Sequence, residues 1–402
     1  MSRDSSILVI GAGPVGSVAA LACAQRGHRV RLLEADHRIN DSPRASTTQP
    51  PTLEIIASLG LIDEYIAQGL VARVFQFWDR ATRTLIAEFD FERLRGETPF
   101  PYVVQTEQHK LANMSIARLR ALPNAQVHLG MRVTGLEQNA DRVTVHAADA
   151  GGAYDFVADY VIACDGGRST VRKALDIEFE GYTWPERFLV ITTRFDFQAA
   201  IDCSLRNYMA GAGEWTNLFK VAGDDLQGRW RAVYNTRQDE SDAEAVSGDA
   251  VRARLARCYA EGADWEHLNL YNVHQRVATQ FRKGRVFLAG DAAHVNNPIG
   301  GLGLNSGIHE AWDLADLLDR VIRGAADASL LDSYERRRRP LNIEHVQEQT
   351  VANKRRLEEA DPARREERFR ELRLAADDPA RHRAFLRRAS LIESVRRAAT
   401  LA

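Results

Sequence analysis

The stretch that sets the architecture is Ile7-Leu8-Val9-Ile10-Gly11-Ala12-Gly13-Pro14-Val15-Gly16. Its four leading apolar residues are typical of a buried parallel strand. An alanine-rich segment follows and predicts a helix that runs to about Arg26 and is ended by Gly27. A second strand is expected from Arg29 to Leu33, with Glu34 at its end. This order predicts a β-α-β unit with G-x-G-x-x-G at its first turn.

Each glycine of this turn has a separate physical task. Gly11 permits the tight turn, Gly13 lets the backbone approach a pyrophosphate, and Gly16 lets helix and strand pack closely. The amino terminus of the helix stabilises phosphate charge. Glu34 lies 18 residues after Gly16, near the position expected for a carboxylate that binds ribose hydroxyls. The unit therefore predicts a dinucleotide site rather than a bare glycine turn, without distinguishing FAD from NAD.

The composition of the 402-residue chain limits its class. Hydrophobic residues make up 45% and charged residues 27%, so the chain can bury a large core, and its length suggests two or three domains. The formal net charge of −2 argues against a nucleic-acid binder, which is usually basic. The arginine runs near the carboxyl end alternate with glutamates, which indicates solvated helix faces.

Cysteine usage bears on the compartment. The four cysteines are far apart and form no C-x-x-C pair, so neither a disulfide framework nor a zinc or other metal site is expected. No segment has the apolar length of a membrane span, and the first ten residues lack the charged start and cleavage site of a signal peptide. We therefore expect a cytoplasmic protein with no membrane or nucleic-acid partner.

Two later segments repeat the pattern of strand, glycine turn and helix. The strand Tyr160–Cys164 leads into Asp165-Gly166-Gly167-Arg168-Ser169, and the strand Arg285–Ala289 leads into Gly290-Asp291-Ala292-Ala293-His294. A glycine-rich loop then opens a helix that runs to about Arg320. An aspartate at the end of a buried strand can hold sugar hydroxyls while free backbone N–H groups bind anionic oxygens.

Together these motifs resemble one family. Gly11–Gly16, Asp165–Gly166 and Gly290–Asp291 occur in the order found in the FAD-dependent aromatic hydroxylases of the p-hydroxybenzoate hydroxylase type, the class A flavoprotein monooxygenases. The resemblance covers roughly residues 5–345. Two shorter matches add to it, Ser42-Pro43-Arg44-Ala45-Ser46 and Gln105.

The resemblance implies a reaction. NADH or NADPH would reduce FAD, O₂ would form a flavin C4a-hydroperoxide, and the distal oxygen would pass to a small phenolic or hydroxypyridine-type aromatic. The run Asn296-Asn297-Pro298-Ile299-Gly300-Gly301 is similar to that of family members that displace a ring substituent. Simple hydroxylation and displacement both stay open at this point, as do the substrate, the choice between NADH and NADPH, and the proton path.

The resemblance also assigns cofactor residues. Glu34 would bind the adenosine ribose, Arg44 the pyrophosphate region and Asp291 the ribityl chain, while Asp165 and Arg168 would support the flavin and the transient nicotinamide. The expected cofactor-binding residues are Gly11, Gly13, Pro14, Val15, Gly16, Glu34, Arg44, Ala45, Gln105, Asp165, Gly166, Arg168, Asp291, Gly303, Leu304 and Asn305.

The middle of the chain predicts an antiparallel sheet. The stretches 184–190, 207–209, 214–219 and 228–234 alternate apolar and polar residues, which is typical of strands with one buried face. The resemblance implies that this face caps the flavin and lines the substrate pocket. The substrate-binding candidates are Trp215, Asn217, Phe219 and Tyr234. The catalytic candidates are Pro298, Tyr208 and His294, although the setting of His294 after a strand favours a structural or flavin-side role.

The expected fold class is α/β, with a Rossmann-like FAD-binding domain, an inserted β-sheet substrate domain and a helical carboxyl-terminal region. We expect the FAD-binding domain to be discontinuous in sequence. Asp361-Pro362 and Asp378-Pro379 predict helix starts, and apolar residues from Phe385 onward would pack on the body or in a homodimer. The expected segments are FAD-binding 1–72, 105–180 and 276–345, substrate-binding 73–104 and 181–275, and helical 346–402.

Four classes of function compete. The first is the aromatic monooxygenase, and the second is another flavoenzyme on the same scaffold, such as an epoxidase, a reductase or a halogenase. The chain has no W-x-W motif, which disfavours the halogenase. A plain NAD-dependent dehydrogenase would leave the segment Gly290–Gly303 without a role. A non-catalytic flavin-binding module is the remaining alternative.

Overall fold

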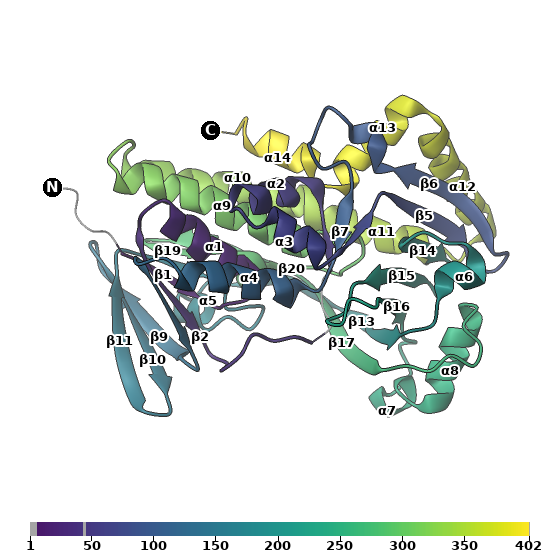
Figure 1. Cartoon of the computed structure of the whole chain (residues 1–402), viewed down its shortest axis with the longest axis horizontal. Coiled ribbons are helices and arrows are strands. Elements are labelled where there is room, and N and C mark those ends of the chain that lie inside the picture. Colours follow the sequence, from purple (N-terminus) through teal and green to yellow (C-terminus); the bar gives the residue numbers. More distant parts are fainter. Residues whose placement is uncertain (1–5, 43–45, 402) are drawn as a thin grey trace.

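The computed structural model of the chain describes residues 6–42 and 46–401. The molecule is longer than it is wide, with one group of strands at the left of Figure 1, a larger sheet at the right, and helices along the top. Within the described ranges, none of the helices combines the length and the apolarity that a membrane crossing requires.

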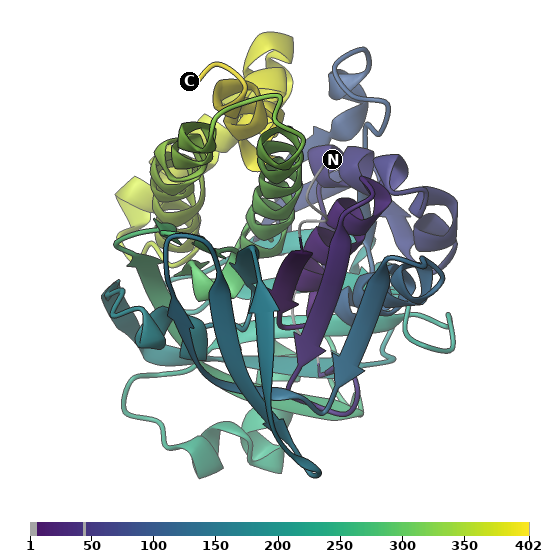
Figure 2. The same cartoon turned by 90° about the vertical axis from the view of Figure 1, so that its left-hand side faces the viewer.

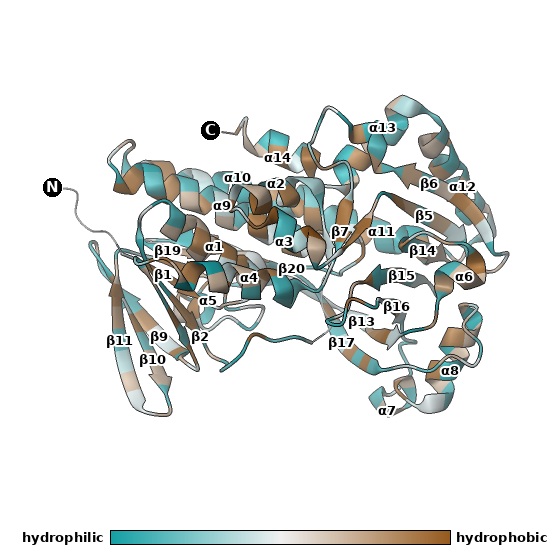
Figure 3. Cartoon of the chain, viewed as in Figure 1, coloured by the Kyte–Doolittle hydropathy of each residue, from teal (hydrophilic) through white to brown (hydrophobic). Residues whose placement is uncertain are grey.

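A mostly parallel sheet forms the amino-terminal layer, in the order β18-β19-β12-β1-β2-β8. Its strands are β1 Ser6–Ile10, β2 Arg29–Glu34, β8 Ala125–Leu129, β12 Tyr160–Ala163, β18 Arg282–Lys283 and β19 Val286–Leu288. Its covering helices are α1 Pro14–Gln25, α4 Gln108–Arg120 and α9 Gly303–Ile322. β1 lies between β2 and β12, and all its residues are buried. α1 packs against α4 and α9 in a layer rich in hydrophobic residues (Figure 3). The predicted β-α-β unit is confirmed.

A second, smaller antiparallel sheet extends from this layer and faces the viewer in Figure 2. Its strands are β9 Arg132–Gln138, β10 Val143–Asp149 and β11 Gly152–Ala158. Val143 and Val145 of β10 are fully buried and belong to the same core as β1, so one side of this sheet is covered by the parallel layer. The other side exposes Val157.

An eight-stranded sheet forms the other end of the molecule, in the order β20-β17-β13-β16-β15-β14-β5-β6. Its strands are β5 Val74–Asp79, β6 Thr84–Asp90, β13 Phe179–Thr193, β14 Arg206–Ala210, β15 Thr216–Val221, β16 Arg229–Asn235, β17 His267–Ala278 and β20 His294–Val295. Most neighbours are antiparallel, but β14 and β5 pair in parallel. The expected sheet therefore exists and draws strands from four distant parts of the chain.

Both faces of this sheet are buried. Tyr208, Asn217 and Val233 stand in one cross-strand row, and the next residues along, Met209 and Tyr234, point to the opposite face. The first face packs toward the carboxyl-terminal helices. The second face is covered by α6 Phe197–Ile201 and α8 Gly248–Arg257, and α7 Asp242–Ala245 packs on α8.

A three-stranded sheet joins the two layers, in the order β3-β7-β4. Its strands are β3 Thr47–Thr48, β4 Leu70–Ala72 and β7 Val103–Gln105. The remaining helices around the parallel layer are α2 Pro50–Ser58, α3 Ile62–Ala67, α5 Thr170–Ala174 and α10 Asp332–Asn342. Strand β3 pairs with β7, and this pairing places Thr47 next to Gln105.

The carboxyl-terminal region is helical, as predicted. Its helices are α11 Glu348–Leu357, α12 Pro362–Asp377, α13 Pro379–Ala389 and α14 Ile392–Ala398. The Asp361 and Asp378 carboxylates accept hydrogen bonds from the first-turn amides of α12 and α13, and a proline begins each helix. Phe385 stacks on Phe89 of the large sheet with ring centroids 4.1 Å apart, so this region packs on the body of its own chain.

Three of the expected segment borders fall inside strands, and the first of them, 104/105, lies in β7. The border at 180/181 lies in β13 and the border at 275/276 lies in β17. These two long strands pair along most of their length, and Ala278 at the end of β17 donates to the carbonyl of Ala293 beside the second glycine turn. The large sheet and the parallel layer are thus tied together by continuous strands.

An aromatic cluster on β6 provides a test of how the carboxyl-terminal helices are held. Phe89 is fully buried between Phe75 and Phe385, whereas Leu85 on the same strand is 42% exposed. We expect Phe89→Ala to lower the free energy of unfolding by about 3–5 kcal/mol, and Leu85→Ala by no more than about 0.5 kcal/mol. Urea unfolding followed by circular dichroism measures both. Equal losses would contradict the cluster's role.

Candidate active site

The first glycine turn is shaped by close backbone contacts. Gly11 has φ +95°, and a Cβ placed on it would lie 2.3 Å from the carbonyl oxygen of Cys164. A Cβ on Gly16 would lie 1.9 Å from the carbonyl oxygen of Gly11. A Cβ on Gly13 would meet nothing within 4 Å. Gly11 and Gly16 are therefore required by the fold, while Gly13 leaves open space beside the turn.

The amino terminus of α1 borders this open space. Gly13 is its N-cap, Pro14 takes the first helical position, and no side chain among the described residues caps it. The first turn of α1 contains no acidic residue. Uncapped N–H groups and the positive end of the helix dipole favour an anion here. The arrangement fits the pyrophosphate of a dinucleotide.

Glu34 is held at the edge of the same turn. Its two carboxylate oxygens accept from the amides of Ala12, at 2.7 Å, and of Asp36, at 3.0 Å. The carboxylate therefore stands at the end of β2 beside the end of β1, where a ribose joined to the pyrophosphate would lie. Its half-buried position is compatible with the predicted ribose contact.

The side chain of Asp165 accepts hydrogen bonds from groups in the turn and helix that follow it. Its carboxylate accepts from the Ser169 hydroxyl at 2.6 Å and from the amide of Val171 at 3.2 Å, which caps α5. Burial raises the pKa of this carboxyl group above its ordinary value. Gly166 adopts φ +80°, and Arg168 is exposed. The expected contacts of Asp165 and Arg168 with the flavin and the nicotinamide stay predictions.

The second glycine turn is organised around a buried glutamate. Glu310 of α9 is fully buried and accepts from the amide of Gly290 at 2.9 Å, from the imidazole of His294 at 2.7 Å and from the Ser306 hydroxyl at 3.0 Å. Asp291, next to Gly290, is exposed. Glu310 thus holds the turn that presents Asp291.

Glu310 was not among the site residues predicted from the sequence, although its position between apolar residues is a signal of burial. It stands in α9 between the apolar residues Ile308, Ala311 and Leu314, all of which are fully buried. A carboxylate at a core position of a helix needs buried donors. Two of its three partners, Gly290 and His294, come from another segment of the chain, so only the folded structure identifies them.

Asn305 ties the loop before α9 to the segment after Thr47. Its side-chain oxygen accepts from the amide of Gln49 at 2.8 Å, and its amide nitrogen donates to the carbonyls of Thr47, at 2.9 Å, and Gly301, at 2.6 Å. The side chain of Asn305 is therefore used by the protein itself. Gly303 starts α9, where a Cβ would lie 2.7 Å from Asn296, and Leu304 follows it.

Two buried side-chain amides at this loop each have one atom without a hydrogen-bond partner among the described residues. Gln105 is fully buried and accepts from the Thr47 hydroxyl at 2.5 Å, but its Nε2 has no acceptor. Gln49 donates to the carbonyl of Gly300 at 3.3 Å, but its Oε1 has no donor. Buried polar atoms are normally satisfied. A flavin edge with both donors and acceptors would satisfy them, so the residues fit FAD. Arg44 and Ala45, also expected at the cofactor, lie outside the described residues.

The four substrate-binding candidates lie on two different faces of the large sheet. Asn217 lies on the same face as Tyr208, and its side-chain oxygen has no partner among the described residues. Phe219 and Trp215 pack on the same side as Tyr208. Tyr234 points to the opposite face, where its hydroxyl donates to the carbonyl of Arg254. Tyr234 therefore cannot line a pocket with Tyr208, and that expectation is wrong.

A cavity of about 270 Å³ lies where the large sheet meets the loop before α9. Tyr208 and Arg206 of β14 and Phe77 of β5 form one side, and Ile299 and Gly300 of the loop form another. Residues of α11 and α13 complete it. Pro298, which precedes Ile299, is exposed. His294 is 1% exposed, bonded to Glu310, and does not line this cavity.

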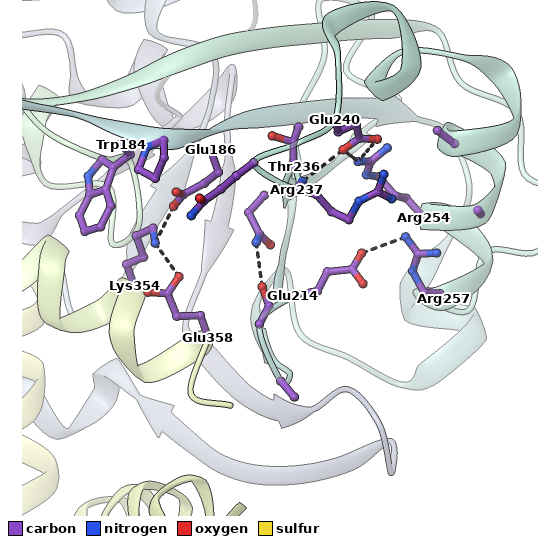
Figure 4. A pocket seen from close by; sticks show the side chains of 17 residues that line it. Trp184, Glu186, Glu214, Thr236, Arg237, Glu240, Arg254, Arg257, Lys354 and Glu358 are labelled. Carbon is purple, nitrogen blue, oxygen red and sulfur yellow. Dashed lines mark hydrogen bonds and ion pairs between the residues drawn. The ribbon is translucent and has the colours of Figure 1, made fainter. Parts of the chain in front are cut away.

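A larger cavity of about 810 Å³ lies at another part of the large sheet (Figure 4). Lys354 of α11 and Glu358, which follows α11, line it together with Glu186 of β13 and Arg254 of α8. None of its lining residues belongs to the loop 296–303. The smaller cavity is therefore the one that adjoins the expected flavin.

The open space at Gly13 gives a test of the cofactor site. We expect Gly13→Val to fold normally, because no protein atom occupies the space, and to lose bound FAD, because the side chain would obstruct the pyrophosphate. Gly135→Val in β9 is the control, since a Cβ there also meets nothing within 4 Å. Flavin absorbance of the purified proteins measures retention. FAD retained by both variants would refute the assignment.

The buried pair of His294 and Glu310 predicts a pH dependence of stability. Burial opposes protonation of His294, but the Glu310 carboxylate outweighs it and raises the pKa of His294. Such a group stabilises the fold fully below its unfolded pKa of about 6.5, and the contribution is lost as pH rises through the folded pKa. We expect the native protein's stability advantage over the double variant His294→Gln/Glu310→Gln to shrink as pH rises from about 6.5 into the alkaline range. Urea titrations across this range measure it, and a constant difference would contradict the ion pair.

Comparison with known proteins identifies the scaffold. The family described as FAD binding domain matches residues 4–349. The chain is 35% identical to para-nitrophenol 4-monooxygenase of Pseudomonas sp. strain WBC-3, over 91% of this chain and 90% of that protein. It is 33% identical to 6-hydroxy-3-succinoylpyridine 3-monooxygenase HspB of Pseudomonas putida strain S16, over 90% and 91%.

Structural comparison agrees with the sequence comparison. The crystal structure of p-nitrophenol 4-monooxygenase PnpA from Pseudomonas putida DLL-E4 superposes with a TM-score of 0.89 at 32% identity, covering 96% of this chain and 99% of that one. The glycine turn with its open space and the buried glutamines at the loop lie within the matched residues 4–349. The chain is therefore a member of the FAD-binding flavoprotein monooxygenases, and it is an FAD-dependent aromatic monooxygenase.

Proposed function

We propose that the enzyme uses NADH or NADPH and O₂ to hydroxylate a small phenolic or hydroxypyridine-type aromatic, with displacement of a ring substituent. Support comes from the two relatives named above, which act on p-nitrophenol and on 6-hydroxy-3-succinoylpyridine. The family resemblance implies that the bound flavin supplies activated oxygen after reduction by the nicotinamide. The protein's part is to bind the aromatic, to orient it and to keep water out.

The observation that carries this proposal is the cavity of about 270 Å³ between β14 and the loop at Ile299–Gly300. Small-molecule pockets begin at about 300 Å³, so this cavity suits a compound with one ring. It adjoins the loop whose neighbouring glutamines fit the flavin. An aromatic ring in the cavity would therefore lie next to the cofactor.

Tyr208 is the residue proposed to activate the ring. Its oxygen accepts from Nη2 of Arg206 at 2.5 Å, so its own O–H is available to donate. A donated hydrogen bond to the substrate oxygen favours the phenolate, which is the better nucleophile toward oxygen. Arg206 itself also donates to the carbonyl of Gly300 at 3.0 Å, which holds Tyr208 and the loop in one network.

The remaining catalytic candidates are given positioning roles. Pro298 would shape the loop that carries Ile299 and Gly300. His294 would act through Glu310 on the turn that presents Asp291. Phe75, Phe77 and Phe385 would exclude water from the cavity, which limits loss of the activated oxygen as peroxide.

We further propose that the nicotinamide binds transiently to the FAD-binding layer, because the sequence contains one G-x-G-x-x-G unit and FAD would occupy it. All four cysteines are free, which suits the reducing cytoplasm. The homodimer stays a prediction.

A substrate panel with product identification tests the proposal. We expect phenols or hydroxypyridines to stimulate NADH or NADPH oxidation and to be converted to ring-hydroxylated products, with release of the substituent where one is displaced. Tyr208→Phe should lower kcat by about 100-fold or more, with a smaller effect on KM. Tyr154→Phe, exposed on β11, is the matched control. If no compound stimulates oxidation, or if Tyr208→Phe behaves like Tyr154→Phe, the proposal fails.

A further inference from the structure

One segment before α9 connects the cofactor side of the structure with the smaller cavity. We call residues 295–300 the flavin loop. The carbonyl of Gly300 accepts a hydrogen bond from Gln49, whose Oε1 is one of the buried atoms that fit FAD. Ile299 and Gly300 also line the smaller cavity. The position of this loop therefore affects how the cofactor meets a ring in the cavity.

Asn297, in the middle of the flavin loop, is fully buried and uses both ends of its side chain. Its Oδ1 accepts from the amide of Ile299 at 3.1 Å, which forms a tight local turn. Its Nδ2 and its backbone amide donate to Oε1 of Gln275 in β17, at 3.3 Å and 3.1 Å. One side chain therefore both shapes the loop and attaches it to the large sheet.

Gln275 is 5% exposed, and every hydrogen-bonding group of its side-chain amide is used. Its Oε1 accepts from the two nitrogens of Asn297 and, at 3.4 Å, from the indole nitrogen of Trp184. Its Nε2 donates to Oε1 and the carbonyl of Gln347, at 2.7 Å and 3.2 Å, and to the Thr350 hydroxyl at 3.1 Å. The amide has one satisfied orientation, because reversing it would oppose like atoms at Asn297 and Gln347.

Gln347 is the last residue of a π-helical turn, Ile343–Gln347, that separates α10 from α11. Such turns are rare, and those that occur are often found at functional sites. This one brings both the carbonyl and the side chain of Gln347 to Gln275. Nε2 of Gln347 also donates to the carbonyl of Val295, at the start of the flavin loop, at 3.2 Å. The turn thus holds the loop both directly and through Gln275.

Helix α11 holds the other end of the flavin loop. Nδ2 of Asn353 donates to the carbonyl of Ile299 at 3.2 Å. The helix itself is fixed to the large sheet by Lys354, whose Nζ lies 2.6 Å from Glu186 of β13 and 2.5 Å from Glu358, as the dashed lines of Figure 4 show. The flavin loop is therefore attached to a fixed support at its start, its middle and its end.

We propose that Asn297 and Gln275 are positioning residues for the oxygen transfer: their contact holds the flavin loop in place between the cofactor and the ring. This inference rests on the proposed function. When the contact is lost, the loop shifts and water enters the cavity, so that NADH, H⁺ and O₂ give NAD⁺ and H₂O₂ in place of a hydroxylated product. A displacement of about 1 Å can lower a rate by about 100-fold.

Replacement of Gln275 by an uncharged side chain of similar size tests the proposal. Gln275→Met leaves the amide of Asn297 without its acceptor, so we expect faster hydrogen exchange at residues 295–301, measured by mass spectrometry. We expect FAD to be retained and product formation to fall by about tenfold or more, with peroxide released in its place. Oxidised nicotinamide, product and peroxide are measured in the same assay with an aromatic that stimulates the native enzyme.

Gln76→Met is the matched control. Gln76 of β5 is 7% exposed, and its amide accepts from Ser204 and donates to Glu88. It follows Phe75 and precedes Phe77, which face the cavity, so it points to the opposite face of the sheet. This variant removes an equally buried amide, but we expect it to keep the native ratio of peroxide to product and native exchange at 295–301.

Asn297→Ser keeps the test independent of whether Gln275→Met folds. Serine retains a side-chain oxygen for the amide of Ile299 but has no nitrogen for Gln275, and the backbone bond to Gln275 remains. We expect a smaller change in the same direction, with product formation lowered by about threefold.

The outcomes separate the positioning role from the proposed function. Unchanged exchange at 295–301 in both variants, an unchanged ratio of peroxide to product, or an equal rise of peroxide in Gln76→Met would overturn the positioning role while hydroxylation by the native enzyme stands. If no aromatic stimulates oxidation in the native enzyme, the proposed function fails and the positioning role fails with it, whereas exchange still reports whether the contact holds the loop.

Discussion

The architecture depends on the contact between the first glycine turn and the end of β12. The backbone of Gly11 comes so close to the carbonyl of Cys164 that a methyl group would not fit, and Gly16 is equally close to Gly11. This approach brings the ends of β1 and β12 close to the start of α1. The uncapped end of α1 and the carboxylate of Glu34 then face the same open space. A bulkier residue would push apart the strands that form the dinucleotide site.

A second close approach extends this site to the flavin end. A Cβ on Gly307 of α9 would lie 2.7 Å from the side chain of Val15, so α9 packs directly on the start of α1. Glu310, one turn further along α9, then reaches the amide of Gly290 and the imidazole of His294. The buried charge is tolerated because donors surround it. Glu310 holds the second glycine turn on α9, and α9 in turn packs on the start of α1 at the first glycine turn.

The substrate cavity has a different origin. Its walls come from β5, β14, the loop before α9 and two carboxyl-terminal helices, which are far apart in sequence. The stacking of Phe385 on Phe89 holds α13 against the sheet, and the bond from Asn353 to Ile299 holds α11 against the loop. The cavity therefore exists only when helices, sheet and flavin loop are assembled, and its charge is the sum of arginines from three elements.

The sequence by itself determined the β-α-β unit and the two aspartate-capped helices, because each depends on residues a few positions apart. It also determined the order of the cofactor motifs, because each motif is a short run of neighbouring residues. It could not determine which face of β16 meets the substrate. Both faces of that strand are buried, so alternation carries no polar signal, and Tyr234 was placed on the wrong side. It also could not identify Glu310 or show that Arg206, Arg356 and Arg388 line the same cavity. The role of each of these groups depends on residues in distant segments of the chain. Only tertiary packing brings those residues together, because it removes water and gathers like charges around one cavity.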